Sequence, residues 1–220
     1  LSSAAGGPGA SDGKFQSGET MRKTKMLLLL LVLVLAAVFA WQRMRAQAPA
    51  AKVAIANTIE NVRLTDLSSN PLSLYDFKGH AAVAIIFVST RCPVSNAYNE
   101  RMAALAREYG ARGVQFIGIN ANRNEPPQEA SQHAREKGLN FLIVKDPGNR
   151  VADYLGASVT PEVYLLDAHW VLRYHGRIDD SQEPSGIRSQ DARAALEAVL
   201  AGQPVSSPRT KAFGCTIKRV

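Results

Sequence analysis

The sequence is poor in the residues that usually bind metal ions. It has two cysteines, Cys92 and Cys215, and four histidines among 220 residues. The histidines are scattered, and no His/Cys spacing is typical of a zinc site. They are His80, His133, His169 and His175. We therefore expect no metal ion and no other cofactor, and we note that two thiols in an oxidising compartment can form one disulfide.

The sequence also lacks a basic run interleaved with aromatic residues. The formal net charge is +7, from 26 Lys or Arg and 19 Asp or Glu. Residues 1–50 hold six of these basic residues and two of the acidic ones, which leaves 20 basic against 17 acidic residues in the remainder. Most of the excess positive charge therefore belongs to the N-terminal segment, and nucleic acid is not an expected partner.

One long apolar run stands near the N-terminus. Residues 1–20 are rich in Gly, Ser and Ala, which indicates a disordered extension or a start site assigned upstream of Met21. Residues 21–50 begin with a basic stretch, which is followed by 16 apolar residues from Met26 to Trp41. Small residues near Ala48 could serve as a cleavage site for a signal peptidase. This length suits either a signal peptide or an N-terminal membrane anchor. Either one exports the following domain, to the periplasm or to the extracytoplasmic side of the membrane.

Residues 58–202 alternate between strand and helix patterns. A hairpin is expected over residues 58–77, and the apolar run 81–88 predicts a strand buried on both faces. The next helix has an apolar stripe formed by Tyr98, Met102, Leu105 and Tyr109. Further strands are expected over 114–119, 141–144, 162–166 and 170–175, and further helices over 128–137, 150–155 and 191–201. This alternation, without internal repeats, predicts an α/β domain with helices on both faces of a sheet.

The segment S-T-R-C-P-V-S, residues 89–95, stands where a strand becomes a helix. Unpaired backbone N–H groups in a first helical turn favour negative charge, so the thiol of Cys92 is more easily ionised there. Arg91 can add to this effect, and Pro93 suits a first turn, where no amide donor is required. The polar approach favours an exposed, reactive cysteine over a buried, inert one. Ser95 either caps the helix or hydrogen-bonds the thiolate.

The order of these elements, with Cys-x-x-Ser at a helix start and Thr160-Pro161 before the last hairpin, resembles the thioredoxin fold. The hairpin L-T-D-L-S-S-N-P-L-S-L-Y-D-F-K-G-H narrows this resemblance to the redoxin branch, which includes extracytoplasmic thiol-disulfide oxidoreductases and peroxiredoxin-like proteins of AhpC/TSA type. The resemblance covers residues 58–202. It implies a central mixed sheet flanked by helices and a catalytic Cys92. It also implies a cis Pro161, which with Thr160 holds a substrate's backbone beside Cys92.

Ser95 departs from the thioredoxin pattern, which has a second cysteine at this position. The motif therefore cannot close its own disulfide, and three outcomes stay open: Cys92 acts as a monothiol, is resolved by Cys215, or attacks peroxide. Cys215 lies in residues 203–220, where Pro204 and Pro208 indicate a flexible tail. Closing a loop of about 120 residues costs only a few kcal/mol more than closing a short one, so resolution by Cys215 is feasible.

The peroxiredoxin pattern is matched in part. It asks for Thr or Ser three residues before the cysteine, where Ser89 stands, and for Pro seven residues before it, where Ile85 stands. It also asks for an arginine against the thiolate. The candidates are Arg91, Arg150, Arg173 and Arg177.

The sequence thus predicts an oxidoreductase that acts on protein disulfides and is served by a thiol reductant. A thiol peroxidase with an antioxidant role is the first alternative. A non-enzymatic thioredoxin-like module that binds partner proteins is the second. Both enzymatic interpretations require the sulfur of Cys92 to be held, exposed and partly ionised, at the start of the helix.

Overall fold

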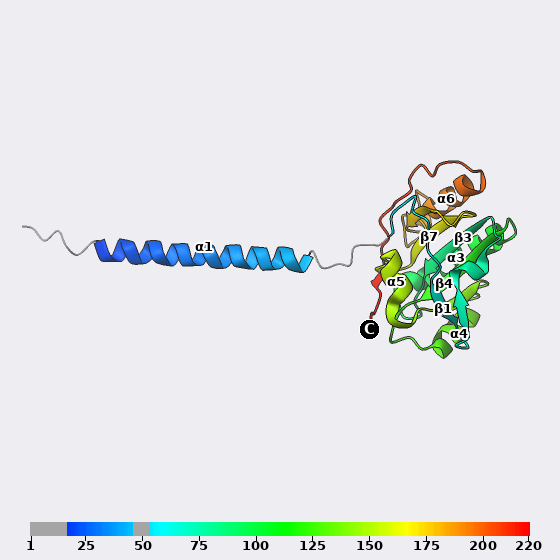
Figure 1. Cartoon of the computed structure of the whole chain (residues 1–220), viewed down its shortest axis with the longest axis horizontal. Coiled ribbons are helices and arrows are strands. Elements are labelled where there is room, and N and C mark those ends of the chain that lie inside the picture. The colour runs from blue at the N-terminus through cyan, green and yellow to red at the C-terminus, as the bar shows by residue number, and fades with distance from the viewer. Residues whose placement is uncertain (1–16, 46–52) are drawn as a thin grey trace, which may run out of the picture. The chain divides into compact units, whose positions relative to one another are not determined.

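The computed structural model describes residues 17–45 and 53–220. Most of the extension expected over residues 1–20, and the cleavage positions near Ala48, lie outside the described residues. Helix α1 spans Ser17–Arg45 and so begins before Met21. Within the two described ranges, no helix combines the length and the apolar character that crossing a membrane requires. The described residues fall into two separate units, 17–45 and 53–220, and the second contains the sheet shown in Figure 1.

Seven strands of the second unit form one mixed sheet, in the order β2-β1-β5-β4-β3-β7-β8. Their bounds are β1 Arg63–Asp66, β2 Pro71–Ser73, β3 Ala82–Phe87, β4 Val114–Asn120, β5 Leu142–Lys145, β7 Glu162–Asp167 and β8 Leu172–Gly176. A separate pair joins β6, Val159–Thr160, to β9, Cys215–Thr216.

The helices follow the strands in the alternating order expected from the sequence. They are α2 Pro93–Ala97, α3 Asn99–Gly110, α4 Pro127–Glu136, α5 Arg150–Leu155 and α6 Asp191–Leu200. Short 3₁₀ turns cover Leu74–Phe77, Pro147–Asn149 and Pro184–Gly186. The predicted central mixed sheet flanked by helices, opened by a β-hairpin of β1 and β2, is confirmed.

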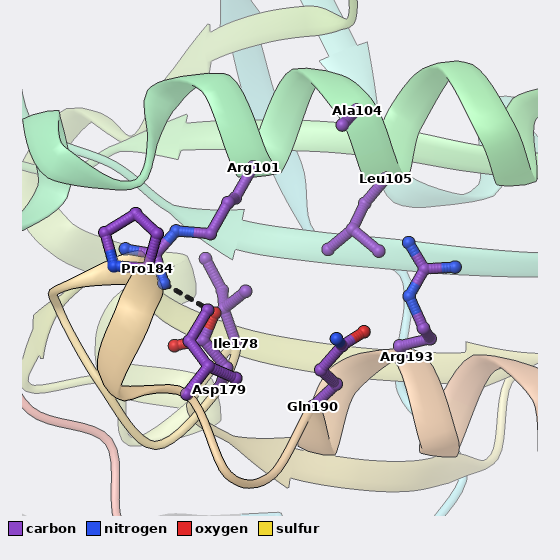
Figure 2. Close-up of a pocket in the computed structure, with 9 residues that line it drawn as sticks. Arg101, Ala104, Leu105, Ile178, Asp179, Pro184, Gln190 and Arg193 are labelled. Atoms are coloured by element: carbon purple, nitrogen blue, oxygen red, sulfur yellow. Dashed lines mark hydrogen bonds and ion pairs between the residues drawn. The ribbon is translucent and has the colours of Figure 1, made fainter.

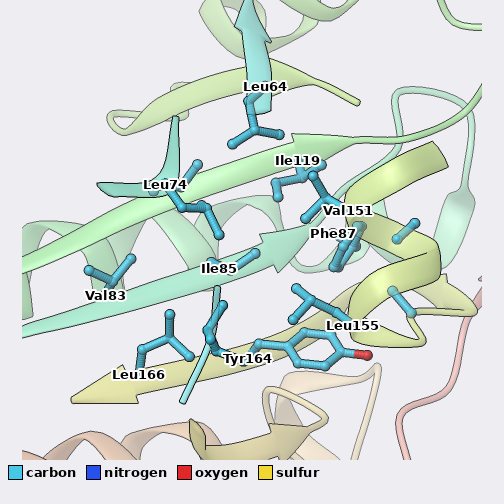
Figure 3. Packing of buried hydrophobic residues seen from close by; sticks show 14 of the residues in the cluster. Leu64, Leu74, Val83, Ile85, Phe87, Ile119, Val151, Leu155, Tyr164 and Leu166 are labelled. Carbon is cyan, nitrogen blue, oxygen red and sulfur yellow. The ribbon is translucent and has the colours of Figure 1, made fainter. Parts of the chain in front are cut away.

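Strand β3 is the centre of the sheet because it carries apolar side chains on both faces. It lies between β4 and β7, and all six of its residues are buried. Its residues contact two separate cores in alternation, as the period of a strand requires. Val83, Ile85 and Phe87 join the core under α5, which Figure 3 shows. Ala82, Ala84 and Ile86 join the core under α3 and α6.

The helix that follows β3 is broken into two segments. Cys92 is the N-cap of α2, and Tyr98 ends α2 and precedes α3. The sequence had suggested Ser95 as the cap, so the helix begins earlier than expected. The apolar stripe of Tyr98, Met102, Leu105 and Tyr109 is buried, as predicted.

The directions of the strands bring three loops to one edge of the sheet. Strands β3, β4 and β5 are parallel, so the segments that leave their carboxyl ends lie side by side. Strand β7 is antiparallel to β3, and its first residue, Glu162, pairs with Phe87 at the end of β3. The turn at Thr160-Pro161 therefore reaches the same edge as Cys92.

The C-terminal segment is packed against the domain, whereas the sequence had suggested a flexible tail. His175 on β8 donates its N–H to the carbonyl of Pro208 at 3.0 Å, and Thr210 donates its N–H to the carbonyl of His175 at 3.0 Å. A Cβ at Gly176 would lie 2.0 Å from Oγ1 of Thr210, so this close approach requires glycine. Further along, Ile217 is 3% exposed. The prolines interrupt regular structure, but these long-range contacts still order the segment.

Glu162 ties three segments together at the start of β7. Its buried carboxylate accepts N–H bonds from Ser158 at 2.8 Å and Val159 at 3.1 Å, and it lies 2.5 Å from Nε2 of His175. Burial raises the pKa of Glu162. The bonds from His175 and the two amides outweigh that effect, so the net pKa lies below the usual 4.5.

We expect Glu162→Gln to lower the free energy of unfolding at pH 7 by about 1–3 kcal/mol, because it weakens buried charge-assisted hydrogen bonds. Since the folded-state pKa is lowered, the contribution of the carboxylate is complete above the unfolded value near 4.5 and is lost as pH falls through the folded-state pKa. Urea unfolding of both proteins between neutral and acidic pH should show the difference shrinking in acid. The exposed change Glu183→Gln is the control, and a difference that does not depend on pH would contradict this expectation.

Candidate active site

The sulfur of Cys92 stands directly beyond the end of β3. Sγ accepts a hydrogen bond from the backbone N–H of Ser95 at 3.3 Å and lies 3.3 Å from the carbonyl oxygen of Thr160. Pro93 occupies the first turn of α2, as expected. The N–H of Ser95 points at the sulfur, so it stabilises negative charge that develops there.

Cys92 and Cys215 form a disulfide. Their Cα atoms are 5.7 Å apart, within the usual range for a disulfide, and 123 residues separate them in the chain. The pairing that the sequence left open is thus present in the structure.

The disulfide is covered on the side of Cys92. Cys92 is 2% exposed, whereas Cys215 is half-buried. The expectation of an exposed sulfur is therefore wrong for the disulfide form. The cover is the tail itself, because Cys215 pairs with Thr160 in the register of β6 and β9. The polar residues before Cys92 could not reveal this cover, since it comes from the far end of the sequence.

The Thr160-Pro161 peptide bond is cis, as the resemblance implied. Thr160 is 2% exposed, and its Oγ1 is one of two buried side-chain polar atoms that lack a hydrogen-bond partner in the described part of the chain. The structure therefore brings Cys92, Cys215 and Thr160 into one place. Pro161 follows within the same turn.

Ser89 and Ser95 contact the backbone of the loop that carries Cys92. Oγ of Ser89 accepts N–H bonds from Cys92 at 3.0 Å and from Arg91 at 3.2 Å. Oγ of Ser95 accepts the N–H of Ser89 at 3.2 Å. The Ser95 hydroxyl thus bonds the loop, and it is the Ser95 amide that bonds the sulfur.

Sequence reasoning missed Glu125, which lies behind this loop. Glu125 is 3% exposed, and its carboxylate accepts bonds from Oγ of Ser89 at 2.6 Å, N–H of Thr90 at 2.9 Å and Nδ2 of Asn120 at 2.6 Å. Lys145 on β5 donates to Oδ1 of Asn120 at 2.5 Å and to the carbonyl of Glu125 at 2.8 Å. This buried network fixes the backbone of residues 89–92. The available signal was a polar residue, Asn120, at the end of a buried strand.

Arg91 is turned away from the sulfur. Its Nε and one terminal nitrogen donate to the carboxylate of Glu129 on α4, at 2.9 Å and 2.6 Å. These bonds, followed by the hydroxyl of Thr90, lower the pKa of Glu129 to about 2. The expectation that Arg91 adds positive charge at Cys92 is therefore not supported by its contacts.

The other arginines considered for a peroxiredoxin-like site also have different surroundings. Arg173 lies 3.8 Å from the carboxylate of Asp167, and Arg177 lies 2.7 Å from that of Asp191. Arg150 is the exposed first residue of α5. Arg173 and Arg177 thus pair with carboxylates, and among the described residues no hydrogen bond or ion pair joins any of the three arginines to Cys92.

A pocket of about 280 Å³ lies between α3 and the segment 178–193, away from both cysteines. Figure 2 shows Arg101 and Arg193 on either side of Leu105, with Ile178 opposite. Arg101 is already paired with Asp179 at 2.6 Å. No group of three His, Cys, Asp or Glu side chains suited to a metal ion occurs among the described residues.

Known proteins share this architecture. Residues 55–180 match the AhpC/TSA family. The thiol:disulfide interchange protein DsbE of Vibrio cholerae is 32% identical over 146 residues, which cover 62% of this chain and 75% of that protein. The thiol-disulfide oxidoreductase ResA of Halalkalibacterium halodurans is 33% identical over 109 residues, which cover 50% of this chain and 60% of that protein.

Two solved structures of similar sequence have the same fold. A hypothetical protein from Sinorhizobium meliloti 1021 superposes with a TM-score of 0.71 at 30% identity, covering 76% of this chain and 96% of that one. An uncharacterised conserved protein from Geobacillus kaustophilus gives 0.70 at 31% identity, covering 76% and 93%. The family match spans more than half of the chain and includes β3, Cys92 and the Thr160-Pro161 turn. With its thioredoxin-like sheet, the chain is therefore an oxidoreductase that belongs to the AhpC/TSA family.

Proposed function

We propose that the chain is an extracytoplasmic thiol-disulfide oxidoreductase in which Cys92 attacks the substrate and Cys215 resolves the intermediate. One observation carries the proposal: Cys92 is bonded to Cys215 directly beside Thr160. The motif C-P-V-S has no second cysteine of its own, and the tail supplies one at bonding distance. Protein disulfides are the proposed substrates.

In the proposed cycle, the Cys92 thiolate attacks one sulfur of a substrate disulfide. The Cys92–substrate bond forms, the substrate S–S bond breaks, and the second substrate sulfur leaves as a thiolate that takes up a proton. The Cys215 thiolate then attacks Sγ of Cys92, and the first substrate sulfur leaves. The substrate gains two electrons as two thiols, and the protein is left with the Cys92–Cys215 disulfide.

A thiol reductant must then return two electrons to the protein. Cys92 is 2% exposed and Cys215 is half-buried, so Cys215 is the more accessible residue of the pair and the proposed target of the reductant. Attack there makes Cys92 the leaving group, and the N–H of Ser95 at 3.3 Å stabilises the departing thiolate.

The remaining parts of the chain fit this activity. Residues 58–202 would form the catalytic domain and residues 203–220 the resolving tail. Residues 21–50 would direct export, as a signal peptide or as a membrane anchor. A stable disulfide suits an oxidising compartment outside the cytoplasm.

Single-turnover mapping tests the two cysteine roles. Each reduced protein is mixed with one equivalent of a peptide disulfide and quenched in acid, and its cysteine-containing peptides are identified by mass spectrometry. We expect Cys92→Ser to form no adduct and Cys215→Ser to accumulate a nearly stoichiometric Cys92–peptide disulfide. Wild type and the exposed tail control Thr216→Ser should yield the Cys92–Cys215 pair and two peptide thiols. Release of both thiols by Cys215→Ser would contradict a resolving role. Sulfenic acid on Cys92 forming with peroxide much faster than any disulfide adduct would favour a peroxidase.

A second prediction restores the cysteine that the thioredoxin pattern has at the position of Ser95. Ser95→Cys places a thiol one helical turn from Cys92, where a Cys-x-x-Cys pair can close. We expect the double variant Ser95→Cys/Cys215→Ser to release both peptide thiols, while Ser95→Ala/Cys215→Ser stalls at the mixed disulfide. The same mapping reads the outcome. A stall of equal length in both double variants would show that this site needs its resolving thiol to come from the tail.

A further inference from the structure

The tail crosses the site as an extended strand. Val159 pairs with Thr216 and Thr160 with Cys215, antiparallel, and the N–H of Ile217 donates to the carbonyl of Ser158 at 3.0 Å. These bonds involve backbone atoms, so any extended peptide can make them. Side chains must therefore decide which peptide fits best.

Alternate residues of the tail face the domain. Cys215 is half-buried at the disulfide, Ile217 is 3% exposed within the core that holds Phe87 and Leu155, and Arg219 is half-buried. Between them, Thr216 and Lys218 are exposed. This period of two is that of a strand lying on a surface. The surface therefore contacts the side chains of the cysteine and of the second residue after it.

The residue before the cysteine must be glycine. A Cβ on Gly214 would lie 1.9 Å from the carbonyl oxygen of Thr160, and φ of Gly214 is +153°, a value that other residues rarely adopt. One residue earlier, the ring of Phe213 packs edge-on against Tyr98, with centroids 6.2 Å apart. An aromatic residue two before the cysteine therefore finds a partner on the domain.

Arg219, near the end of the tail, contributes less to the fit between the tail and the domain than the residues around Cys215. Nε of Arg219 donates to Asp153 at 2.9 Å, and a terminal nitrogen donates to the carbonyl of Ala157 at 2.6 Å. Asp153 is about half exposed, so solvent screens this ion pair. The dominant features are the aromatic residue, the glycine, the cysteine and the aliphatic residue.

We propose that the surface under residues 213–217 is the docking site for extended segments of partner proteins with the pattern aromatic-Gly-Cys-x-aliphatic, for which the tail is the internal template. The proposal deepens the proposed function and rests on it. In the disulfide form Cys92 is 2% exposed beneath β9, so while the tail keeps this position a substrate sulfur can reach Cys92 only by displacing the tail. A partner segment and the tail therefore compete for the same backbone edge, and a segment with the tail's own pattern competes best.

The test uses the full chain carrying Cys215→Ser and a peptide of residues 211–219 whose cysteine bears thionitrobenzoate as a mixed disulfide. The Cys92 thiolate displaces thionitrobenzoate, the Cys92–peptide disulfide forms, and the coloured anion that leaves reports the rate. Three altered peptides carry Gly214→Ala, Ile217→Ser or, as the matched control at an exposed position, Thr216→Ser.

We expect the Gly214→Ala and Ile217→Ser peptides to react about tenfold more slowly than the parent peptide or worse, since each loses a close fit or a buried aliphatic group. The Thr216→Ser peptide should react at nearly the parent rate. In a second protein, Gly214→Ala/Cys215→Ser, the protein's own tail fits poorly, so the parent peptide should react faster. Reduced wild type, followed over its first turnover, supplies the same comparison with an unaltered chain.

The outcomes separate the two proposals. Equal rates for all four peptides, with Cys92 reacting, would overturn the docking pattern and leave the proposed function intact. Absence of reaction with every peptide in both the Cys215→Ser protein and reduced wild type would overturn the proposed function as well.

Discussion

The pairing of Thr160 with Cys215 is the contact on which the site depends. It joins the turn before β7 to a segment 55 residues further along the chain, and it places the second sulfur over Cys92. Without this strand pair, the motif C-P-V-S would be a thiol without a partner in the chain. With it, the site has two sulfurs and a backbone edge within one small region.

The loop that carries Cys92 is fixed by a buried polar network as well as by the disulfide to the tail. The charged group of Glu125 is buried, which is costly unless it is paired and hydrogen-bonded. Here it accepts three bonds, and Lys145 bonds the same segment. Through Ser89, this network reaches the amide of Cys92. The loop between β3 and α2 therefore does not rely on the disulfide alone for its shape.

Much of the fold could be predicted from local patterns. The unbroken apolar run of β3, the stripe from Tyr98 to Tyr109 and the hairpin before them carry strong periodic signals. The resemblance then supplied the cis turn at Pro161 and its position near Cys92. The cover over Cys92 depends on a contact between segments far apart in the sequence, for which no local pattern exists. The role of Glu125 also depends on distant contacts, and its local signal was a single polar residue, Asn120, at the end of β4. Arg91 shows that closeness in sequence can also mislead. It stands next to Cys92 in the chain, but its side chain bonds Glu129 and points away from the sulfur.

The course of the tail along β8 has a consequence for solubility. Strand β8 lies at one end of the sheet, and an uncovered end strand offers free amides and carbonyls to other chains. Pro208 and Thr210 take up both backbone groups of His175 there before the chain continues to Cys215. The same segment thus occupies the backbone groups of His175 and delivers the second thiol, so loss of residues 208–220 would remove a reactive group and also leave this part of the edge strand open to pairing with other chains.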